Sequence, residues 1–101
     1  MSSLRYSDAA KADLIEIARF IARDKPEAAR RWAAAVRAKC RLLAGHPYLG
    51  DDRSDLGIGV RAVYIGHFII FFRHHNSLLE IIRVRRGDLD SPFDSERRRL
   101  R

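Results

Sequence analysis

The chain has 101 residues, of which 47% are apolar, and this predicts one globular domain over residues 1–101 rather than a disordered chain. The formal net charge is +7, and seventeen of the twenty basic residues are arginine, the other three being lysine. Because arginine makes planar, bidentate contacts with phosphate or carboxylate, this balance fits either a nucleic acid or an acidic protein, and composition alone does not choose between them.

The first residues predict an edge strand followed by a helix. Leu4–Ser7 fits the strand, and Ser7 or Asp8 can cap a helix that runs from about residue 8 to residue 23. Apolar residues recur there at helical spacing, at Leu14, Ile17, Ala18 and Ile21. The polar residues lie mostly off that stripe, at Lys11, Asp13, Glu16 and Arg19.

A second helix is predicted from Pro26 to Gly45. Proline fits the first turn of a helix, and glycine commonly follows the last. The stripe of this helix is Ala29, Trp32, Ala33, Val36, Cys40 and Leu43. Two helices joined by so short a link form an antiparallel hairpin. Cys40 and Trp32 lie on the stripe. We therefore interpret both as core residues, in preference to Cys40 as a nucleophile or Trp32 as a platform for a ligand.

The second half of the chain predicts a loop and three strands. Residues 46–59 contain Pro, Gly and Asp without a period and read as an ordered loop. Three segments rich in β-branched and aromatic residues follow: Val60–Ile65, His67–Arg73 and Leu78–Arg85. Gly66 and His74–Ser77 mark the turns. The predicted fold is α+β, in the order β-α-α-β-β-β, with an antiparallel sheet packed on the helical hairpin.

Arginines occur in or at the ends of all three C-terminal strands, at Arg61, Arg73, Arg83 and Arg85. Arg83 and Arg85 are two residues apart and share one face, with Ile82 and Val84 directed into the core. Two helices cover one face of the sheet, so the opposite face is predicted to carry a basic patch. A solvated polar face that binds nothing is the competing interpretation.

Both faces of the predicted strand His67–Arg73 are apolar, since Phe68, Ile70 and Phe72 alternate with Ile69 and Phe71. That pattern is typical of a central strand or of a strand under a partner.

No catalytic or cofactor motif is visible. The chain has no glycine-rich phosphate loop, no Ser/His/Asp pattern and no metal-ligand spacing, so we expect no cofactor, no metal and no catalytic residue. His74 and His75 are adjacent and point in opposite directions in a strand-like geometry, which is poor for one metal ion.

Features of cellular location point to the cytoplasm. A single cysteine, Cys40, excludes an internal disulfide and suits a reducing compartment. The N-terminus lacks a signal-peptide core, and no apolar run approaches the ~20 residues that span a bilayer. We therefore expect a cytoplasmic protein without a membrane partner.

Five stretches together resemble the RelE/ParE toxin superfamily, in particular its ParE branch, over roughly residues 4–90. They are YSDAAKADLIEIARFIA, KPEAARRW, LLAGHPYLGDDRSDL, GVRAVYIGHFIIFFR and EIIRVRRG. The resemblance implies a toxin of a type II toxin–antitoxin system that is neutralised by a ParD-like antitoxin. It also implies that the free toxin inhibits DNA gyrase by binding, without being an enzyme, and so stops replication.

The alternative within the superfamily is a ribosome-dependent mRNA endoribonuclease of RelE type, which would use Arg61, Arg73 and Arg83. Cleavage by a 2′-hydroxyl needs a proton acceptor and a proton donor as well as cations on the phosphate. No His or Tyr follows His75. Arginine, with a pKa above ~12, is a poor proton shuttle. The ending therefore favours protein binding over catalysis.

We expect the antitoxin segment to carry acidic residues for the arginines and apolar residues for the helical hairpin. The predicted partner-binding residues are Arg61, Arg73, Arg83, Arg85, Arg86, Trp32 and Phe71. Direct nucleic-acid binding is not expected, because the aromatic residues read mostly as core. A flexible tail is predicted from about residue 95.

Overall fold

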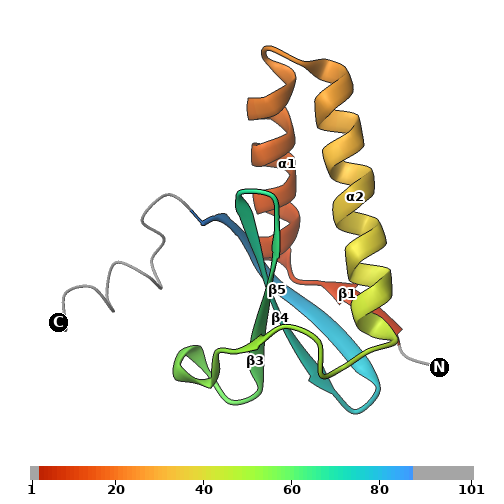
Figure 1. The fold of residues 1–101 in the computed structure, drawn as a ribbon, viewed down its shortest axis with the longest axis vertical. Helices are drawn as coiled ribbons and strands as arrows, with labels where there is room; N and C mark the ends of the chain where they lie inside the picture. Colours follow the sequence, from red (N-terminus) through yellow and green to blue (C-terminus); the bar gives the residue numbers. More distant parts are fainter. Residues whose placement is uncertain (1–2, 88–101) are drawn as a thin grey trace, which may run out of the picture.

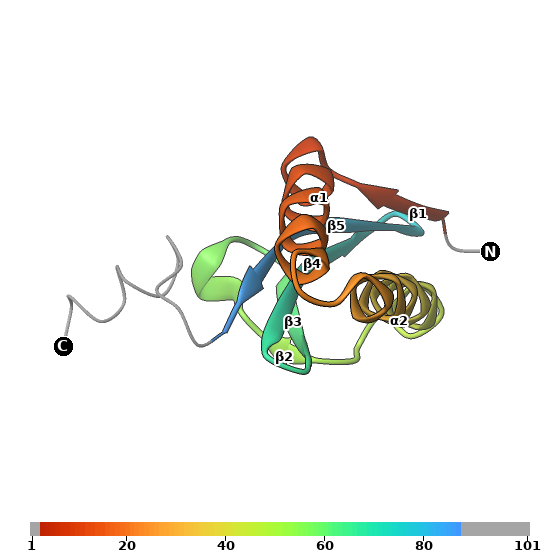
Figure 2. The ribbon, with the colours of Figure 1, turned by 90° about the horizontal axis from the view of Figure 1, so that it is seen from above.

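A helical hairpin packs on one face of a five-stranded sheet (Figures 1 and 2). The structure is a computed structural model that describes residues 3–87, so the predicted tail lies outside it. The elements are β1 (Ser3–Tyr6), α1 (Asp8–Ala22), α2 (Pro26–Ala44), β2 (Asp51–Asp52), the 3-10 helix η1 (Ser54–Leu56), β3 (Val60–Ile65), β4 (Phe68–His75) and β5 (Leu78–Arg86).

The sheet order is β1-β5-β4-β3-β2, so the first strand pairs with the last. β1 runs parallel to β5, and the other pairs are antiparallel. This confirms the predicted α+β fold with its helical hairpin. Within residues 3–87, neither helix is long and apolar enough to cross a membrane.

Local sequence signals explain where the helices begin and end. The Ser7 hydroxyl accepts a hydrogen bond from the Ala10 backbone N–H, with 3.0 Å between Oγ and N, which caps α1. Pro26 occupies the first turn of α2, and Gly45 is its C-terminal cap. Both signals were readable in the sequence because capping depends on a few neighbouring residues.

Two predictions for the second half were wrong. The segment 46–59 is not entirely loop, because β2 pairs with β3 through Asp51–Ala62 and Asp52–Arg61, and η1 follows it. His74 and His75 lie in β4 rather than in a turn. The turn consists of Asn76 and Ser77 alone, with φ of 48° and 63°. Those angles suit the tight two-residue turns that join twisted antiparallel strands.

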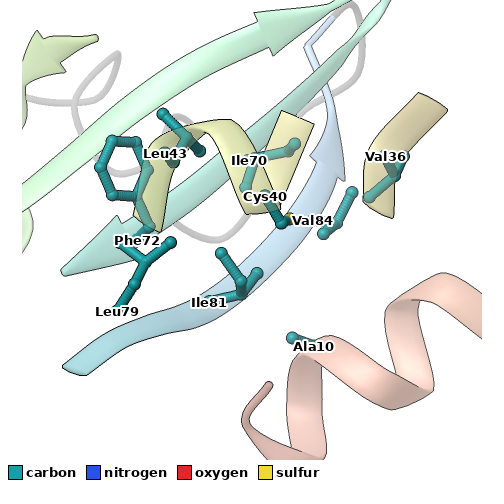
Figure 3. Close-up of a cluster of buried hydrophobic side chains, with 9 residues drawn as sticks. All are labelled: Ala10, Val36, Cys40, Leu43, Ile70, Phe72, Leu79, Ile81 and Val84. Atoms are coloured by element: carbon teal, nitrogen blue, oxygen red, sulfur yellow. The ribbon is translucent and has the colours of Figure 1, made fainter. Parts of the chain in front are cut away.

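The main core lies between the helical hairpin and the sheet (Figure 3). Val36, Cys40 and Leu43 project from α2 toward β4 and β5, and none is exposed to solvent. The strands contribute Ile70, Phe72, Leu79, Ile81 and Val84, and α1 contributes Ala10. Cys40 therefore is a core residue, as predicted. Its thiol has a raised pKa, because burial disfavours the thiolate.

A second apolar cluster covers the opposite face of the sheet, where a basic patch was expected. It consists of Val60, Ala62, Ile69 and Phe71, with Leu56 and Ile82 packed against it. These strand residues alternate with residues that pack on the main core, as the period of two requires. Leu56 comes from η1, so the segment after α2 covers part of the face that the helices leave open.

The edge of β5 is completed by α1 where β1 ends. The Ser7 hydroxyl donates to the Ile82 carbonyl oxygen at 2.8 Å, and the Asp13 carboxylate accepts from the Val84 N–H at 3.0 Å. The pairing of β4 with β5 is irregular here. Phe71 pairs with Arg83, but the next residue, Phe72, pairs with Ile81 and not with Ile82. Ile82 is thus an extra residue and packs on the second cluster, not in the main core as predicted.

Gly50 provides a test of how the segment after α2 is held on β3. Its φ is +86°, and a Cβ atom there would lie 2.5 Å from the Ala62 carbonyl oxygen. We expect Gly50→Ala to lower the free energy of unfolding by about 2 kcal/mol, because backbone strain and a steric clash add. Gly45→Ala is the control, since its Cβ would meet nothing closer than 3.7 Å. Urea unfolding measures both, and equal stability of the two variants would contradict the close approach.

Asp13 provides a test of the junction between α1 and β5. It is only 7% exposed and accepts from Val84 and from Arg83. We expect Asp13→Asn to destabilise the fold by about 2 kcal/mol, because the charge that satisfies these donors is lost. Glu16→Gln, an exposed change on the same helix, is expected to stay within about 0.5 kcal/mol of the original chain in urea unfolding. A similarly small effect of Asp13→Asn would show that the junction does not stabilise the fold.

Candidate partner-binding site

Arg83 and Arg85 come together, as the sequence predicted, but around a carboxylate of the chain itself. Arg83 makes a bidentate contact with Asp13, with Nε 2.8 Å and Nη2 3.0 Å from the two carboxylate oxygens. Arg85 Nη1 lies 3.6 Å from Asp13 Oδ1. The hydrogen bond to Asp13 raises the pKa of Arg83 above its usual value. Much of the positive charge expected on this face is therefore balanced internally.

Of the other two strand arginines, Arg73 shares the open face of the sheet with this pair, because its partner Val60 belongs to the second cluster. Arg73 is 3.6 Å from the Glu80 carboxylate, between Nη2 and Oε1. Arg61 faces the helix side of the sheet, since its neighbours on β3, Val60 and Ala62, belong to the second cluster. Its guanidinium donates to three backbone carbonyl oxygens, those of Tyr48, Leu49 and Gly50, at 3.0, 3.0 and 2.7 Å. Arg61 thus holds the segment after α2, and the four arginines form no single patch.

The two predicted aromatic contacts are largely covered. Phe71 is 1% exposed, and the Arg53 guanidinium lies 5.7 Å from its ring centroid. Trp32 is half-buried against the main core, with its ring centroid 5.1 Å from that of Phe68. A partner could therefore reach Phe71 only after Arg53 moves. The Trp32 ring packs against the Phe68 ring.

A groove lies beside α1, between that helix and the strands β4 and β5. It has a volume of about 720 Å³ and is lined by Ala12, Ile15, Glu16, Ile17, Arg19, Phe20, Arg23, Phe68 and Arg86. Figure 1 shows α1 standing beside the end of β5, the strand that supplies Arg86. Of the seven predicted contact residues, Arg86 alone lines this groove.

The groove combines exposed apolar side chains with a cationic rim. Ile15 and Phe20 are 53% and 56% exposed, which is high for such large apolar residues. Three arginines and one carboxylate, Glu16, are the charged groups of its lining. The Arg23 guanidinium lies 6.0 Å from the Phe20 ring centroid, so cation and aromatic ring share the surface.

Sequence reasoning missed this groove although a signal was present. Ile15 and Phe20 are apolar residues that do not belong to the stripe Leu14, Ile17, Ala18 and Ile21. An amphipathic helix with one covered face leaves such off-stripe residues in solvent. Asp13 also lies off the stripe, yet it is buried because the β5 edge needs an acceptor there.

The lining of the groove combines apolar and cationic side chains. Apolar side chains with a basic rim suit an amphipathic segment that carries carboxylates beside its apolar face. Within residues 3–87, no group of three His, Cys, Asp or Glu side chains is placed to hold a metal ion.

Comparisons with known proteins agree on the family. Residues 4–90 match a family model described as the ParE toxin of the type II toxin–antitoxin system parDE. A solved structure described as the chromosomal ParDE system from P. aeruginosa is similar at 25% identity and a TM-score of 0.74, covering 87% of this chain and 98% of that chain. A comparison with curated protein sequences found no match.

A second solved structure has a similar fold. The RelBE2 toxin–antitoxin complex from Mycobacterium tuberculosis is similar at 21% identity and a TM-score of 0.60, covering 84% of this chain and 96% of that chain. At that identity the likeness concerns the fold alone. The family match spans most of the chain and all of its described helices and strands from β1 to β5, apart from Ser3. The chain therefore belongs to the ParE toxin family of type II toxin–antitoxin systems.

Proposed function

We propose that the chain arrests growth by binding DNA gyrase and stopping replication, and that a ParD-like antitoxin neutralises it. The observation that carries this proposal is the groove on α1, where exposed Ile15 and Phe20 lie among three arginines. Such a surface binds a protein segment and makes or breaks no bond. The similar structure from P. aeruginosa is a ParDE system, which supports an antitoxin partner of the ParD kind.

The antitoxin segment in this proposal is an amphipathic acidic one. Its apolar residues contact Phe20, Ile15 and Phe68, and its carboxylates pair with Arg19 and Arg23. In this proposal, burial of the exposed Phe20 ring supplies most of the affinity, and the arginines supply register and a faster association rate.

The hydrogen bonds that the strand arginines make within the chain support protein binding over RNA cleavage. Two of the three arginines that a RelE-type site would use are occupied, Arg83 by the Asp13 carboxylate and Arg61 by the carbonyl oxygens after α2. A phosphate at Arg83 would compete with a carboxylate held by the fold. The arginine-rich strands therefore contribute to stability, and the groove is the surface that we propose for a partner.

The antitoxin contact is tested by Phe20→Ala. Because Phe20 is exposed, the variant is expected to fold normally but to bind the ParD-like antitoxin at least about tenfold more weakly, as for an aromatic anchor. Isothermal titration calorimetry gives the affinity. Tyr48→Ala is the matched control, since Tyr48 is 86% exposed and does not line the groove. Equal affinities of the two variants would place the antitoxin elsewhere.

The gyrase target is tested in a supercoiling and cleavage assay with purified gyrase. We expect the chain to trap gyrase–DNA cleavage complexes and the antitoxin to reverse the effect. A parallel reaction with translating ribosomes and mRNA tests the alternative function, which is ribosome-dependent mRNA cleavage of the RelE type. Cleaved mRNA, together with unaffected gyrase, would replace the gyrase proposal with a ribonuclease activity.

A further inference from the structure

The positive charge of the hairpin is concentrated on α2. That helix holds five cations and one anion, Glu27, for a net charge of +4. The packed neighbour α1 holds two cations and three anions, for a net charge of −1. α2 therefore carries more than half of the chain's formal charge of +7. α1 packs beside α2 and leaves the outer face of α2 open to solvent (Figure 2).

Three of these cations form a line, which we name the α2 ridge: Arg30, Arg37 and Arg41. They are spaced by seven and four residues, so at 3.6 residues per turn they fall within an arc of about 40°. They extend over about 17 Å of the helix axis. All three residues are exposed, and so are Ala34 and Ala38 between them.

Within residues 3–87, two of the three ridge arginines have no acidic partner. Among residues 3–87, Glu27 pairs with Arg30, and no acidic side chain forms a salt bridge with Arg37 or Arg41. Arg37 and Arg41 are four residues apart, and like charges at that spacing destabilise a helix. Both also act on Tyr6, whose pKa burial raises and these two guanidinium groups lower.

We propose that the α2 ridge binds the phosphate backbone of a nucleic-acid duplex. A row of guanidinium groups on a straight helix complements a regular polyanion, and alanines between them allow close approach. An acidic protein surface is a poorer match, because a protein interface needs a large apolar anchor at its centre. The exposed apolar residue of α2, Leu42, lies about 100° around the helix from Arg41.

Single-stranded nucleic acid is also a poorer match. Its binding uses exposed aromatic rings on which bases stack. The one aromatic residue of α2, Trp32, packs on Phe68 instead. The expectation that the chain does not bind nucleic acid directly rested on this lack of aromatic platforms, which backbone contacts to a duplex do not need. The inference goes beyond the proposed function, because it uses neither the groove nor gyrase.

The test is fluorescence anisotropy of the full chain with a labelled mixed-sequence DNA duplex of about 20 base pairs, from about 50 to 200 mM KCl. Three neutralised phosphates predict an affinity loss of about 40-fold over that range. In the variant Arg37→Ala/Arg41→Ala one phosphate contact remains, so the affinity is expected to fall only about 3.5-fold over the same range of KCl. Arg37→Lys/Arg41→Lys is expected to keep the salt dependence, because it keeps the charge.

The matched control is Arg19→Ala/Arg23→Ala, which removes the same charge from the groove on α1 and is expected to keep the 40-fold loss. An RNA duplex of equal length identifies which duplex the ridge prefers, and binding of either supports the proposal. Three results would overturn it: no binding at about 50 mM KCl, equal effects of the two alanine pairs, or ridge-dependent binding of polyglutamate in place of both duplexes. Alanine favours helix, so circular dichroism is expected to show folded variants.

Discussion

The hydrogen-bonding edge of β5 is the constraint on which the rest of the structure depends. β1 pairs with β5 only as far as Ile81, and the strand continues to Arg86. Backbone groups beyond that point need partners in a partly buried place. Ser7 and Asp13 supply them from the start of α1, which fixes that helix against the strand. The same contact sets Ile15 and Phe20 beside Arg86 and thereby creates the groove.

Arginine has three separate uses in this chain. Arg61 and Arg83 are structural, since one holds backbone carbonyl oxygens and the other a buried carboxylate. Arg19 and Arg23 form the rim of the groove. The α2 ridge faces solvent on the other helix. The guanidinium group serves all three because it offers several donors in one plane and keeps its charge when partly desolvated. A high arginine content therefore does not imply one basic site.

One fold can host different activities, because function depends on the side chains that its strands and helices present. In this chain the open face of the sheet is closed by Leu56 and by Arg53 over Phe71, and its arginines are paired. The exposed apolar side chains of α1, Ile15 and Phe20, lie in the groove. In our proposal recognition takes place there, where side chains can change without disturbing the sheet.

The sequence by itself determined the α+β fold, the order of its main elements, the core stripe of α2 and the family resemblance. These follow from local periodicity, capping and turn residues, which act over a few neighbouring positions. The pairing of Asp13 with Arg83, the extra residue Ile82 in β5 and the burial of Phe71 were decided only by the tertiary structure. Each joins positions far apart in the chain, and periodicity carries no record of which distant group meets an unpaired donor. The partners of two strand arginines were decided in the same way, since Arg83 meets Asp13 and Arg61 meets the carbonyl oxygens after α2 only in the folded chain.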